Sequence, residues 1–363
     1  MPVLSSEGNI ARQVAEHYRQ LIKSGRSRPG ERLPTNRELS KRLGVGLGTV
    51  HQAFATLGQE GLIYRRKRLG TFVGRSPIEI PAALDVGVLF RMPREWGADD
   101  NYGLQMFQGI QEALQSGGHQ ITLVTFASED GFSGRTDEVP RQFTGRPMHG
   151  YIVDERVPDA LIARLADGGR TVIVVNRGCK LAGVGAAFRD NRQAGVEAAG
   201  RLLAAGHRVA GCVLRDDWNG HAAAEAFLAA MTAARAAVPA ARVVVFDGRC
   251  PDPPAFRILM SAVPVPTAIF ATDAYVAKYM VKMAMKSGLR VPRDLAVVGA
   301  LDLEFASRTE PPLTTMRFEP EAIGRAAVEE LVACCREPGR SPRQQAIAGQ
   351  WVERGSMVSV QDA

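Results

Sequence analysis

The sequence is poor in the residue patterns from which enzymes build metal, nucleophilic and phosphate-transfer sites. Its 363 residues include five cysteines and six histidines, and none of these forms a Cys-x-x-Cys or His-Glu-x-x-His pair. A P-loop and a Gly-x-Ser-x-Gly elbow are also missing. We therefore expect a protein that is not an enzyme and that binds no metal and no cofactor. The odd number and the scattered positions of the cysteines are typical of reduced thiols in a reducing compartment.

Long hydrophobic runs are missing as well, although apolar residues make up 45% of the chain. The longest runs, such as 171–175, have the length of a strand, whereas a membrane-spanning helix needs about 20 apolar residues. The first ten residues do not show the basic and then apolar pattern of a signal peptide. We therefore expect a cytoplasmic protein without a membrane partner, and the length allows two or three domains.

Positive charge is concentrated near the N-terminus. Residues 1–76 contain fourteen Lys and Arg against five Asp and Glu, a net charge of +9. The whole chain carries +7, so the remainder carries −2. A basic region on a nearly neutral body indicates that this region meets a polyanion, although a basic, merely soluble surface would give the same charge.

The first 75 residues show the order of elements of a winged helix-turn-helix. The apolar periodicity predicts helices at 9–24, 36–43 and 47–58, followed by short strands at 62–64 and 71–73. Thr35 and Glu38 form the Thr-x-x-Glu pattern of a capping box, which begins the second helix. An exposed N-terminus of the third helix fits the major groove of DNA. The basic run 65–68 at the hairpin tip can contact phosphates or the minor groove.

Short motifs follow one another along this region. They are Leu33-Pro34-Thr35-x-Arg37-Glu38-Leu39, Leu43-Gly44-Val45, Thr49-Val50, Ala53, Leu57, Glu60-Gly61-Leu62-Ile63 and Gly70-Thr71-Phe72-Val73. In this order they resemble the DNA-binding domain of the GntR family over residues 9–75. The resemblance implies a double-stranded DNA operator as the partner, with the third helix and the wing against it. The residues that we expect at the DNA are Thr35, Arg37, Leu47, Thr49, His51, Gln52, Arg66, Lys67, Arg68 and Gly70.

The third helix also departs from the GntR pattern. Leu47 lies in the run that usually carries an arginine, so this position can contact a thymine methyl group but cannot donate to guanine. His51 replaces another usual arginine. We therefore expect an operator that differs from those of relatives, with more of the affinity carried by phosphate contacts. Alternatively, Arg37, His51 and the run 65–68 are solvated surface residues.

From residue 85 onward, strands and helices alternate, which predicts an α/β fold with parallel sheets wrapped by helices. Strands are expected at 86–90, 121–126, 150–153, 172–175, 184–187, 209–214, 243–246, 268–270 and 295–298, and helices at 102–115, 158–166, 192–205, 221–234, 274–285 and 322–334. Nine strands are many for one small sheet, so we expect two similar lobes. Ligands of such folds bind at the carboxyl ends of the strands, which here form a cleft between the lobes.

A second set of motifs lies in the second half of the chain. The motifs are Leu202-Leu203-x-x-Gly206-His207-Arg208-Val209, Pro266-Thr267-Ala268-Ile269-Phe270-Ala271-Thr272-Asp273, Val291-Pro292-x-Asp294-Leu295-x-Val297-Val298-Gly299, Pro312-Leu313-Thr314-Thr315-Met316 and Glu353-Arg354-Gly355-Ser356. They resemble the effector domain of the LacI family, which is similar in fold to periplasmic sugar-binding proteins, over residues 85–358. A GntR-type head on such a domain is the arrangement of AraR-like regulators. The resemblance implies a sugar-like effector in the cleft. The residues that we expect to contact it are Arg91, Trp96, Asp190, Arg215, Trp218, Asp273 and Asp302.

The expected pocket has structural alternatives and departures from the family. Asp190 and Asp273 precede helices and could cap them instead, and Trp218 could pack within a lobe. Ala223 stands where the family places a ligand-binding arginine. Leu301 replaces the usual acid after the strand at 295–298, with Asp302 one position further on. Such a pocket could bind something other than a simple sugar, or nothing.

The sequence therefore predicts a homodimeric transcription regulator, in the first instance a repressor. We expect a winged helix-turn-helix domain at 1–76, a linker at 77–84 and an effector-binding and dimerisation domain at 85–363. A small molecule between the lobes would change the affinity for a two-fold symmetric operator. The alternative is a DNA-binding regulator whose sensor domain has lost or changed its ligand and acts mainly in dimerisation. The basic head and the lack of a signal peptide disfavour a transport-type binding protein.

Overall fold

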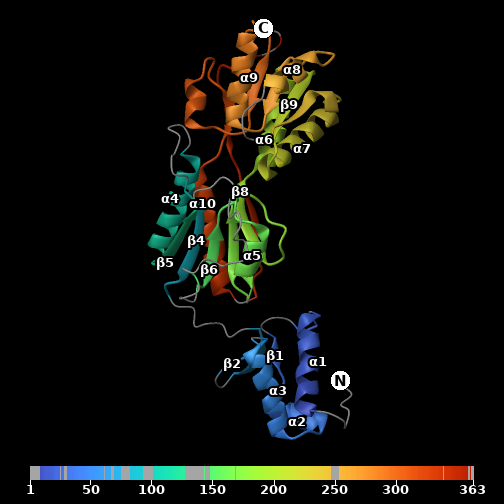
Figure 1. The fold of residues 1–363 in the computed structure, drawn as a ribbon, viewed down its shortest axis with the longest axis vertical. Helices are drawn as coiled ribbons and strands as arrows, with labels where there is room; N and C mark the ends of the chain where they lie inside the picture. The colour runs from blue at the N-terminus through green and yellow to red at the C-terminus, as the bar shows by residue number, and fades with distance from the viewer. Residues whose placement is uncertain are drawn as a thin grey trace.

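The chain folds around three β-sheets (Figure 1). The computed structural model describes residues 9–24, 26–27, 31–60, 62–66, 69–74, 82–92, 101–126, 143, 148–167, 169–246, 253–337, 339–358 and 360. One three-stranded sheet belongs to the N-terminal domain, and two six-stranded sheets form two lobes of a larger domain. This arrangement confirms the predicted α/β fold with an N-terminal winged helix. Most of the expected linker 77–84 lies outside the described residues.

The N-terminal domain packs three helices against a small antiparallel sheet. Its elements are α1 (Ile10–Lys23), β1 (Arg32–Leu33), α2 (Asn36–Leu43), α3 (Leu47–Gln59), β2 (Ile63–Arg66) and β3 (Gly70–Val73), and the strand order is β1-β3-β2. The predicted capping box begins α2, and Gly44 ends it in the left-handed conformation at φ 65°. Phe54 of α3 packs edge-on against Tyr18 of α1, with 5.6 Å between ring centroids. This packing buries one face of α3 and leaves the opposite face exposed.

The first lobe of the large domain is a parallel sheet covered by helices. Its elements are β4 (Asp85–Arg91), α4 (Tyr102–Ser116), β5 (Gln120–Phe126), β6 (Gly150–Val153), α5 (Asp159–Ala166), β7 (Thr171–Val175), β8 (Val184–Arg189), α10 (Pro320–Arg336) and β14 (Gln344–Ile347). The strand order is β14-β8-β7-β6-β4-β5, and β6, β7 and most of β4 are buried. Burial on both faces explains why these strands appear as continuous apolar runs in the sequence.

The second lobe repeats this layered arrangement. Its elements are α6 (Asn191–Ala204), β9 (Ala210–Arg215), α7 (Trp218–Ala233), η2 (Ala240–Arg242), β10 (Val243–Phe246), α8 (Pro253–Ser261), β11 (Ala268–Ala271), α9 (Ala274–Lys286), β12 (Ala296–Gly299), η3 (Glu304–Arg308), β13 (Thr314–Arg317) and β15 (Gln350–Val352). The strand order is β10-β9-β11-β12-β13-β15, with β15 antiparallel to β13 and the other pairs parallel.

The chain passes between the two lobes three times, at β8 to α6, β13 to α10 and β14 to β15. The first and third connections are hydrogen-bonded to each other. The amide of Asp190 donates to the carbonyl of Ile347 over 2.8 Å, and the side chain of Gln193 exchanges two hydrogen bonds with the backbone of Gly349. A Cβ on Gly349 would lie 2.7 Å from the Phe318 ring of the second connection. The three connections therefore form one packed bundle.

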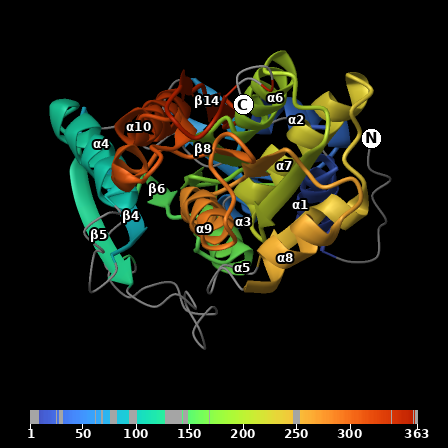
Figure 2. The ribbon, with the colours of Figure 1, turned by 90° about the horizontal axis from the view of Figure 1, so that it is seen from above.

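Two helices of the first lobe approach each other through glycines. Helices α4 and α10 lie side by side (Figure 2). A Cβ on Gly109 of α4 would collide with the backbone of Glu321, and a Cβ on Gly324 of α10 would collide with the backbone of Met106. The absence of a side chain at both positions thus allows the two helix backbones to touch.

The start of β4 is held by two imidazoles. The backbone amide of Leu84 donates to Nδ1 of His119 over 3.1 Å, and the amide of Asp85 donates to Nδ1 of His149 over 2.9 Å. Burial lowers the pKa of His119, and the positive charge of Arg336 adds to this effect. An unprotonated Nδ1 is what both hydrogen bonds require, because only then can the ring nitrogen accept.

The structure confirms the predicted strands and helices to within a few residues and adds short elements. Helix α8 and strands β1, β13, β14 and β15 were not predicted, and α7 begins at Trp218 rather than at 221. Over the described part of the chain, no helix combines the length and the apolar character that crossing a membrane requires.

The helix crossing makes a stability prediction. Gly324→Ala inserts a methyl group into the α4 backbone, and we expect it to lower the free energy of unfolding by about 1–3 kcal/mol, as overpacking does. Gly200→Ala in α6 is the control, because nothing lies within 4 Å of its Cβ position. This control is expected to gain up to about 1 kcal/mol. Chemical denaturation midpoints measure both variants, and equal stability of Gly324→Ala and the parent would refute the close crossing.

Candidate functional sites: a basic groove and an interlobe cleft

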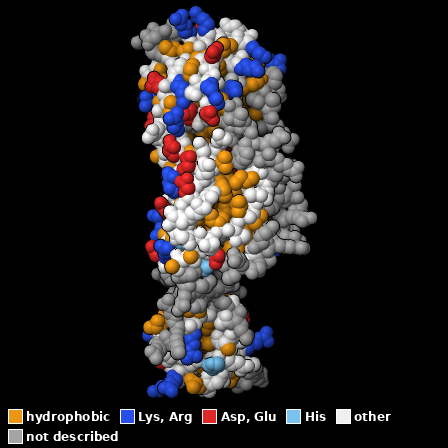
Figure 3. All heavy atoms as spheres, turned by 90° about the vertical axis from the view of Figure 1, so that its left-hand side faces the viewer, with side chains coloured by type: hydrophobic (Ala, Val, Ile, Leu, Met, Phe, Trp, Pro, Cys, Tyr) orange, Lys and Arg blue, Asp and Glu red, His pale blue; other side chains and the backbone are white. Residues whose placement is uncertain are grey.

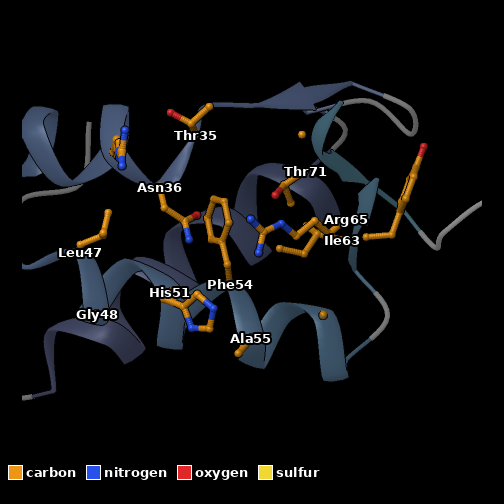
Figure 4. A pocket seen from close by; sticks show the side chains of 14 residues that line it. Thr35, Asn36, Leu47, Gly48, His51, Phe54, Ala55, Ile63, Arg65 and Thr71 are labelled. Carbon is orange, nitrogen blue, oxygen red and sulfur yellow. The ribbon is translucent and has the colours of Figure 1, made fainter. Parts of the chain in front are cut away.

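A groove opens on the N-terminal domain between α2, α3 and the β2–β3 hairpin (Figure 4). The side chains around it come from the beginnings of both helices and from the facing strands. The lining residues include Thr35, Asn36, Arg37, Leu47, Gly48, His51, Phe54, Arg65, Gly70 and Thr71. Figure 4 shows Arg65 reaching from β2 toward Phe54 and Asn36. Basic and polar side chains thus surround the N-termini of α2 and α3.

The N-terminus of α3 is open to an anion. Its N-cap residue is Gly46, which offers no side chain to the first amides of the helix. Unsatisfied amides and the helix dipole together favour negative charge at this point. Leu47, the first helical residue, is 49% exposed, so an apolar contact is available beside these amides. The N-terminus of α2 differs, because Thr35 and Glu38 already satisfy its cap.

The structure brings together half of the residues expected at DNA. Thr35, Arg37, Leu47, His51 and Gly70 line the groove. Thr49, half-buried, and Gln52, exposed, lie on α3 outside the lining. Arg66 ends β2, with a side chain that is not described, and Lys67 and Arg68 lie outside the described residues. Sequence reasoning did not single out Asn36, whose position directly after the cap places it at the helix N-terminus.

The second site is a cleft between the lobes, at the carboxyl ends of the parallel strands. Its volume is about 130 Å³, below the about 300–1,000 Å³ typical of drug-sized ligands. The charged residues that line it are Arg91, Asp154, Glu155, Arg156, Arg189, Arg215, Asp217 and Asp273. Tyr102, Asn176 and Asn219 add neutral polar groups. The cleft therefore fits a small, strongly polar molecule.

One arginine of the cleft is neutralised by the protein itself. Arg215 ends β9 and contacts Asp217 over 3.0 Å and Asp273 over 3.2 Å. Asp273 is also the N-cap of α9, where its carboxylate accepts from the amides of Tyr275 and Val276. The ligand role and the capping role considered for Asp273 are thus compatible.

Glu155 is the acid at the centre of the cleft. Its Oε2 accepts from Asn176 Nδ2 over 2.9 Å and from Asn219 Nδ2 over 3.2 Å. Burial, and then the charge of the neighbouring Asp154, raise the pKa of Glu155 to about 7. Asn219 belongs to the second lobe and Glu155 to the first, so this contact joins the two lobes directly.

The interlobe contact continues to the first connection between the lobes. Asn191 donates from Nδ2 to Asn219 Oδ1 over 2.6 Å, and its Oδ1 accepts from Nε of Arg189 over 2.8 Å. Asn176 has a left-handed backbone at φ 65°, a conformation that asparagine tolerates better than most residues. A chain of amides therefore links both lobes to the connecting segment.

The residues expected to contact an effector divide into two groups. Arg91, Arg215 and Asp273 line the cleft, whereas Asp190 caps α6 by accepting from the amide of Gln193. Trp218 packs edge-on against Phe188, with ring centroids 4.8 Å apart, and lies outside the cleft lining. Trp96 lies outside the described residues.

Asp302 is bound within the protein rather than placed in the cleft. Its carboxylate accepts from Arg354 Nη1 over 2.8 Å, from Arg317 Nε over 2.9 Å and from Thr315 Oγ1 over 2.8 Å. Burial opposes ionisation, but these donors lower the pKa of Asp302. Arg317 ends β13, so this cluster holds the second connection between the lobes.

Sequence reasoning did not select Tyr102, Glu155, Asn176, Arg189 or Asn219, all of which line the cleft. Glu155 and Asn176 follow strands β6 and β7. Position after a strand end is therefore the signal that could have found them.

The pKa of Glu155 predicts a pH dependence of stability. A carboxyl group whose folded pKa of about 7 exceeds its ordinary 4.5 contributes stability at low pH that is lost as the pH rises through about 7. Glu155→Gln removes this titration. We expect the melting temperature of the parent to fall relative to the variant between about pH 5 and about pH 8. Glu329→Gln, at an exposed position of α10, is the control, and parallel pH profiles for Glu155→Gln and the parent would contradict the assignment.

Two stretches of the chain match known protein families. Residues 10–73 match the model for bacterial regulatory proteins of the gntR family, and residues 199–357 match the periplasmic binding protein-like domain. The arabinose metabolism transcriptional repressor of Geobacillus stearothermophilus is 25% identical over 336 residues, covering 88% of this chain and 89% of that protein. The HTH-type transcriptional repressor NagR of Bacillus subtilis is 40% identical over 67 residues, 18% of this chain and 28% of that protein.

Solved structures show the same fold. The complex of the transcriptional regulator CelR with cellobiose superposes with a TM-score of 0.65 at 21% identity, covering 89% of this chain and all of that one. A LacI transcriptional regulator from a Rhodococcus species gives a TM-score of 0.62 at 23% identity, covering 76% of this chain and 99% of that one. The chain therefore joins an N-terminal domain that matches the gntR family to a domain that matches the periplasmic binding protein-like family and has the fold of LacI-type regulators.

Proposed function

We propose that this protein is a cytoplasmic transcriptional repressor whose affinity for a DNA operator changes when a small molecule binds between its lobes. Residues 1–76 would bind DNA, 77–84 would act as linker, and 85–363 would bind the effector and dimerise. The observation that carries the proposal is the groove at the beginnings of α2 and α3, on a region of net charge +9. Arabinose appears in the name of a relative that matches 88% of the chain, which supports a sugar-like effector.

The groove supplies the two kinds of contact that DNA recognition needs. The open N-terminus of α3, Arg37 and Arg65 are suited to phosphates, which fix the position of the protein on the duplex. Leu47 and His51 project from the exposed face of α3 and are suited to base edges in the major groove. Because Leu47 is apolar, a thymine methyl group is its natural partner.

The cleft would transmit effector binding to the operator through the lobes. A small molecule that contacts both lobes stabilises one relative orientation of them. It changes DNA affinity only to the extent that its own affinity differs between the two orientations. Asn219 and Glu155 already join the lobes across the cleft, so an arriving ligand competes with or extends this contact.

We further propose a homodimer through the face of α4 and β5. Strand β5 is an edge of its sheet, and an apolar edge strand is a ready surface for association. Leu123 on this strand is 40% exposed, and Figure 3 shows apolar side chains gathered over the first lobe on this side of the molecule. A two-fold axis here would place two DNA-binding domains on a symmetric operator.

A second candidate is a regulator whose sensor domain acts mainly in dimerisation. The observation that favours it is Ala223, which is fully buried in α7 and contributes nothing to the cleft, at the position where LacI-type relatives are expected to carry a ligand arginine. In that case no small molecule would alter DNA binding.

The proposed function is tested by measuring binding of the full chain to the DNA upstream of its own gene, with and without a panel of sugars and sugar derivatives. Specific binding that one compound alters supports the regulator with a working sensor. Specific binding that no compound alters supports the second candidate. Absence of specific binding contradicts both.

The β2–β3 hairpin, which is the wing of the winged helix-turn-helix, allows a quantitative prediction of the salt dependence of DNA binding. Each phosphate contact adds about 0.9 to the slope of log affinity against log salt. Replacing Arg66, Lys67 and Arg68 with Ala should therefore reduce the slope by about one to three. The control replaces Arg257, Lys282 and Lys286, which are exposed on the second lobe. An unchanged slope in the wing variant would remove the wing from the DNA interface.

The proposed dimer interface on α4 and β5 allows a prediction of the oligomeric state. Leu123→Lys places a charge on the proposed interface of the full chain, and we expect a monomer in sedimentation velocity, because an unpaired buried charge is costly. Val245→Lys is the matched control, since Val245 is 57% exposed on the edge strand β10 of the other lobe. A dimeric Leu123→Lys variant would place the interface elsewhere.

A further inference from the structure

Arg189 is a buried cation at the boundary between the lobes. It ends β8, immediately before the first connection, and only 7% of its surface is exposed. Its Nε donates to Asn191 Oδ1 over 2.8 Å, and its Cζ lies 5.7 Å from the centre of the Tyr102 ring. Within the described ranges Arg189 forms no ion pair at salt-bridge distance, although its positive charge counters the rise in the pKa of Glu155. A buried cation without a close counter-ion is costly.

The neighbouring arginine in the same cleft shows the contrast. Arg215 has two carboxylates, Asp217 and Asp273, within 3.2 Å. Both arginines line the same small cleft, yet among the residues that the structure describes only Arg215 has carboxylates at ion-pair distance. The terminal nitrogens of Arg189 form a planar fork that matches a carboxylate or a phosphate.

Two further polar atoms of the cleft are not fully hydrogen-bonded. In the part of the chain that is described, Oδ1 of Asn176 is buried without a hydrogen bond. The hydroxyl of Tyr102 is also buried and donates to no acceptor, with the Arg189 guanidinium beside it as a donor. Tyr102 is 9% exposed and lies against Arg189. Buried polar groups are nearly always paired in native proteins. The cleft therefore offers a ligand the hydroxyl donor of Tyr102 beside the guanidinium of Arg189. It also offers the acceptor Oδ1 of Asn176 on the first lobe.

The acids Asp154 and Glu155 of the cleft repel an anion less strongly than two fully ionised carboxylates would. Burial raises the pKa values of Asp154 and Glu155, that of Glu155 to about 7, so the carboxyl of Glu155 is only partly ionised near neutral pH. Arg91 and Arg156 line the cleft beside them. With Arg215 neutralised separately, the remaining charge around Arg189 favours a negative ligand.

We propose that the effector is a small anionic polyol, a sugar-sized molecule that carries one carboxylate or phosphate group. The anionic group binds the terminal nitrogens of Arg189 and the hydroxyl of Tyr102, and a ligand hydroxyl donates to Oδ1 of Asn176. This inference rests on the proposed function, because it assigns the chemical class of the effector. The cleft volume of about 130 Å³ limits the ligand to a single sugar-like unit.

The first test is calorimetric titration of the full chain with two matched series. One series is D-glucose, D-gluconate and D-glucose 6-phosphate, and the other is D-ribose, D-ribonate and D-ribose 5-phosphate. We expect at least one anionic member to bind at least tenfold more tightly than its neutral parent. The preferred member tells whether the anion is a carboxylate or a phosphate. Equal or tighter binding of the neutral sugars, or binding of none of the six, overturns the proposal.

The second test removes the cation. Arg189→Gln should weaken binding of the anionic compound about ten- to hundredfold, the range expected for a lost charge-assisted hydrogen bond, and should leave binding of the neutral parent unchanged. Arg189→Lys keeps the charge without the planar fork and should recover part of the affinity. Arg192→Gln, an exposed neighbour on α6, is the control. Equal losses for anionic and neutral compounds in Arg189→Gln overturn the assignment.

The third test uses Tyr102→Phe, which keeps the ring and removes only the hydroxyl. We expect the melting temperature without ligand to rise or stay unchanged, because a buried unsatisfied group is removed, while the anionic compound binds several-fold more weakly. Unchanged ligand affinity in this variant would exclude the hydroxyl from the site.

The outcomes for ligand class and for regulation can be separated. If an anionic compound binds in the cleft but leaves DNA binding unaltered, the ligand class stands and the regulatory function fails. If only a neutral sugar alters DNA binding, the regulatory function stands and the ligand class fails.

Discussion

The arrangement of the two lobes depends on three chain crossings that are held together in one bundle. Hydrogen bonds between Asp190, Gln193 and the third connection hold the first and third crossings in register. The carboxylate of Asp302 binds Arg317, which leads into the second crossing, and Arg354, which follows the third crossing. It therefore fixes the chain beside both crossings. Buried and saturated with donors, Asp302 serves the hinge. A loss of both arginines would leave this buried charge without a counter-ion.

The same segment that forms the hinge also forms part of the cleft. Arg189 and Asn191 flank the first crossing, and Asn191 contacts Asn219 of the second lobe. In the proposed mechanism, ligand recognition and lobe orientation would therefore use the same side chains, and no long pathway between the cleft and the connections would be needed. Small displacements at such a position are amplified because packed interfaces have discrete arrangements rather than a continuous range.

Sequence patterns predicted the fold well where burial produces long apolar runs or where a cap has a specific chemistry. The strand at 150–153 and the helix at 36–43 were predicted to the residue, because the first is buried on both faces and the second begins at a capping box. The short edge strands β14 and β15 have only partly buried side chains, and no apolar run marks them. In the cleft, Arg91, Arg215 and Asp273 could be selected from their positions at strand ends. Arg189 also ends a strand, but the lack of a close counter-ion that distinguishes it is revealed only by its three-dimensional neighbours.

The two imidazoles at the start of β4 set the reach of the DNA-binding domain. Since His119 fixes the chain at Leu84 and β3 ends at Val73, ten residues separate the two folded parts. Ten residues extend at most about 35 Å, so each DNA-binding domain can lie no farther than this from the start of its own first lobe. In the proposed dimer, two such tethers would set an upper limit on the spacing of the operator half-sites.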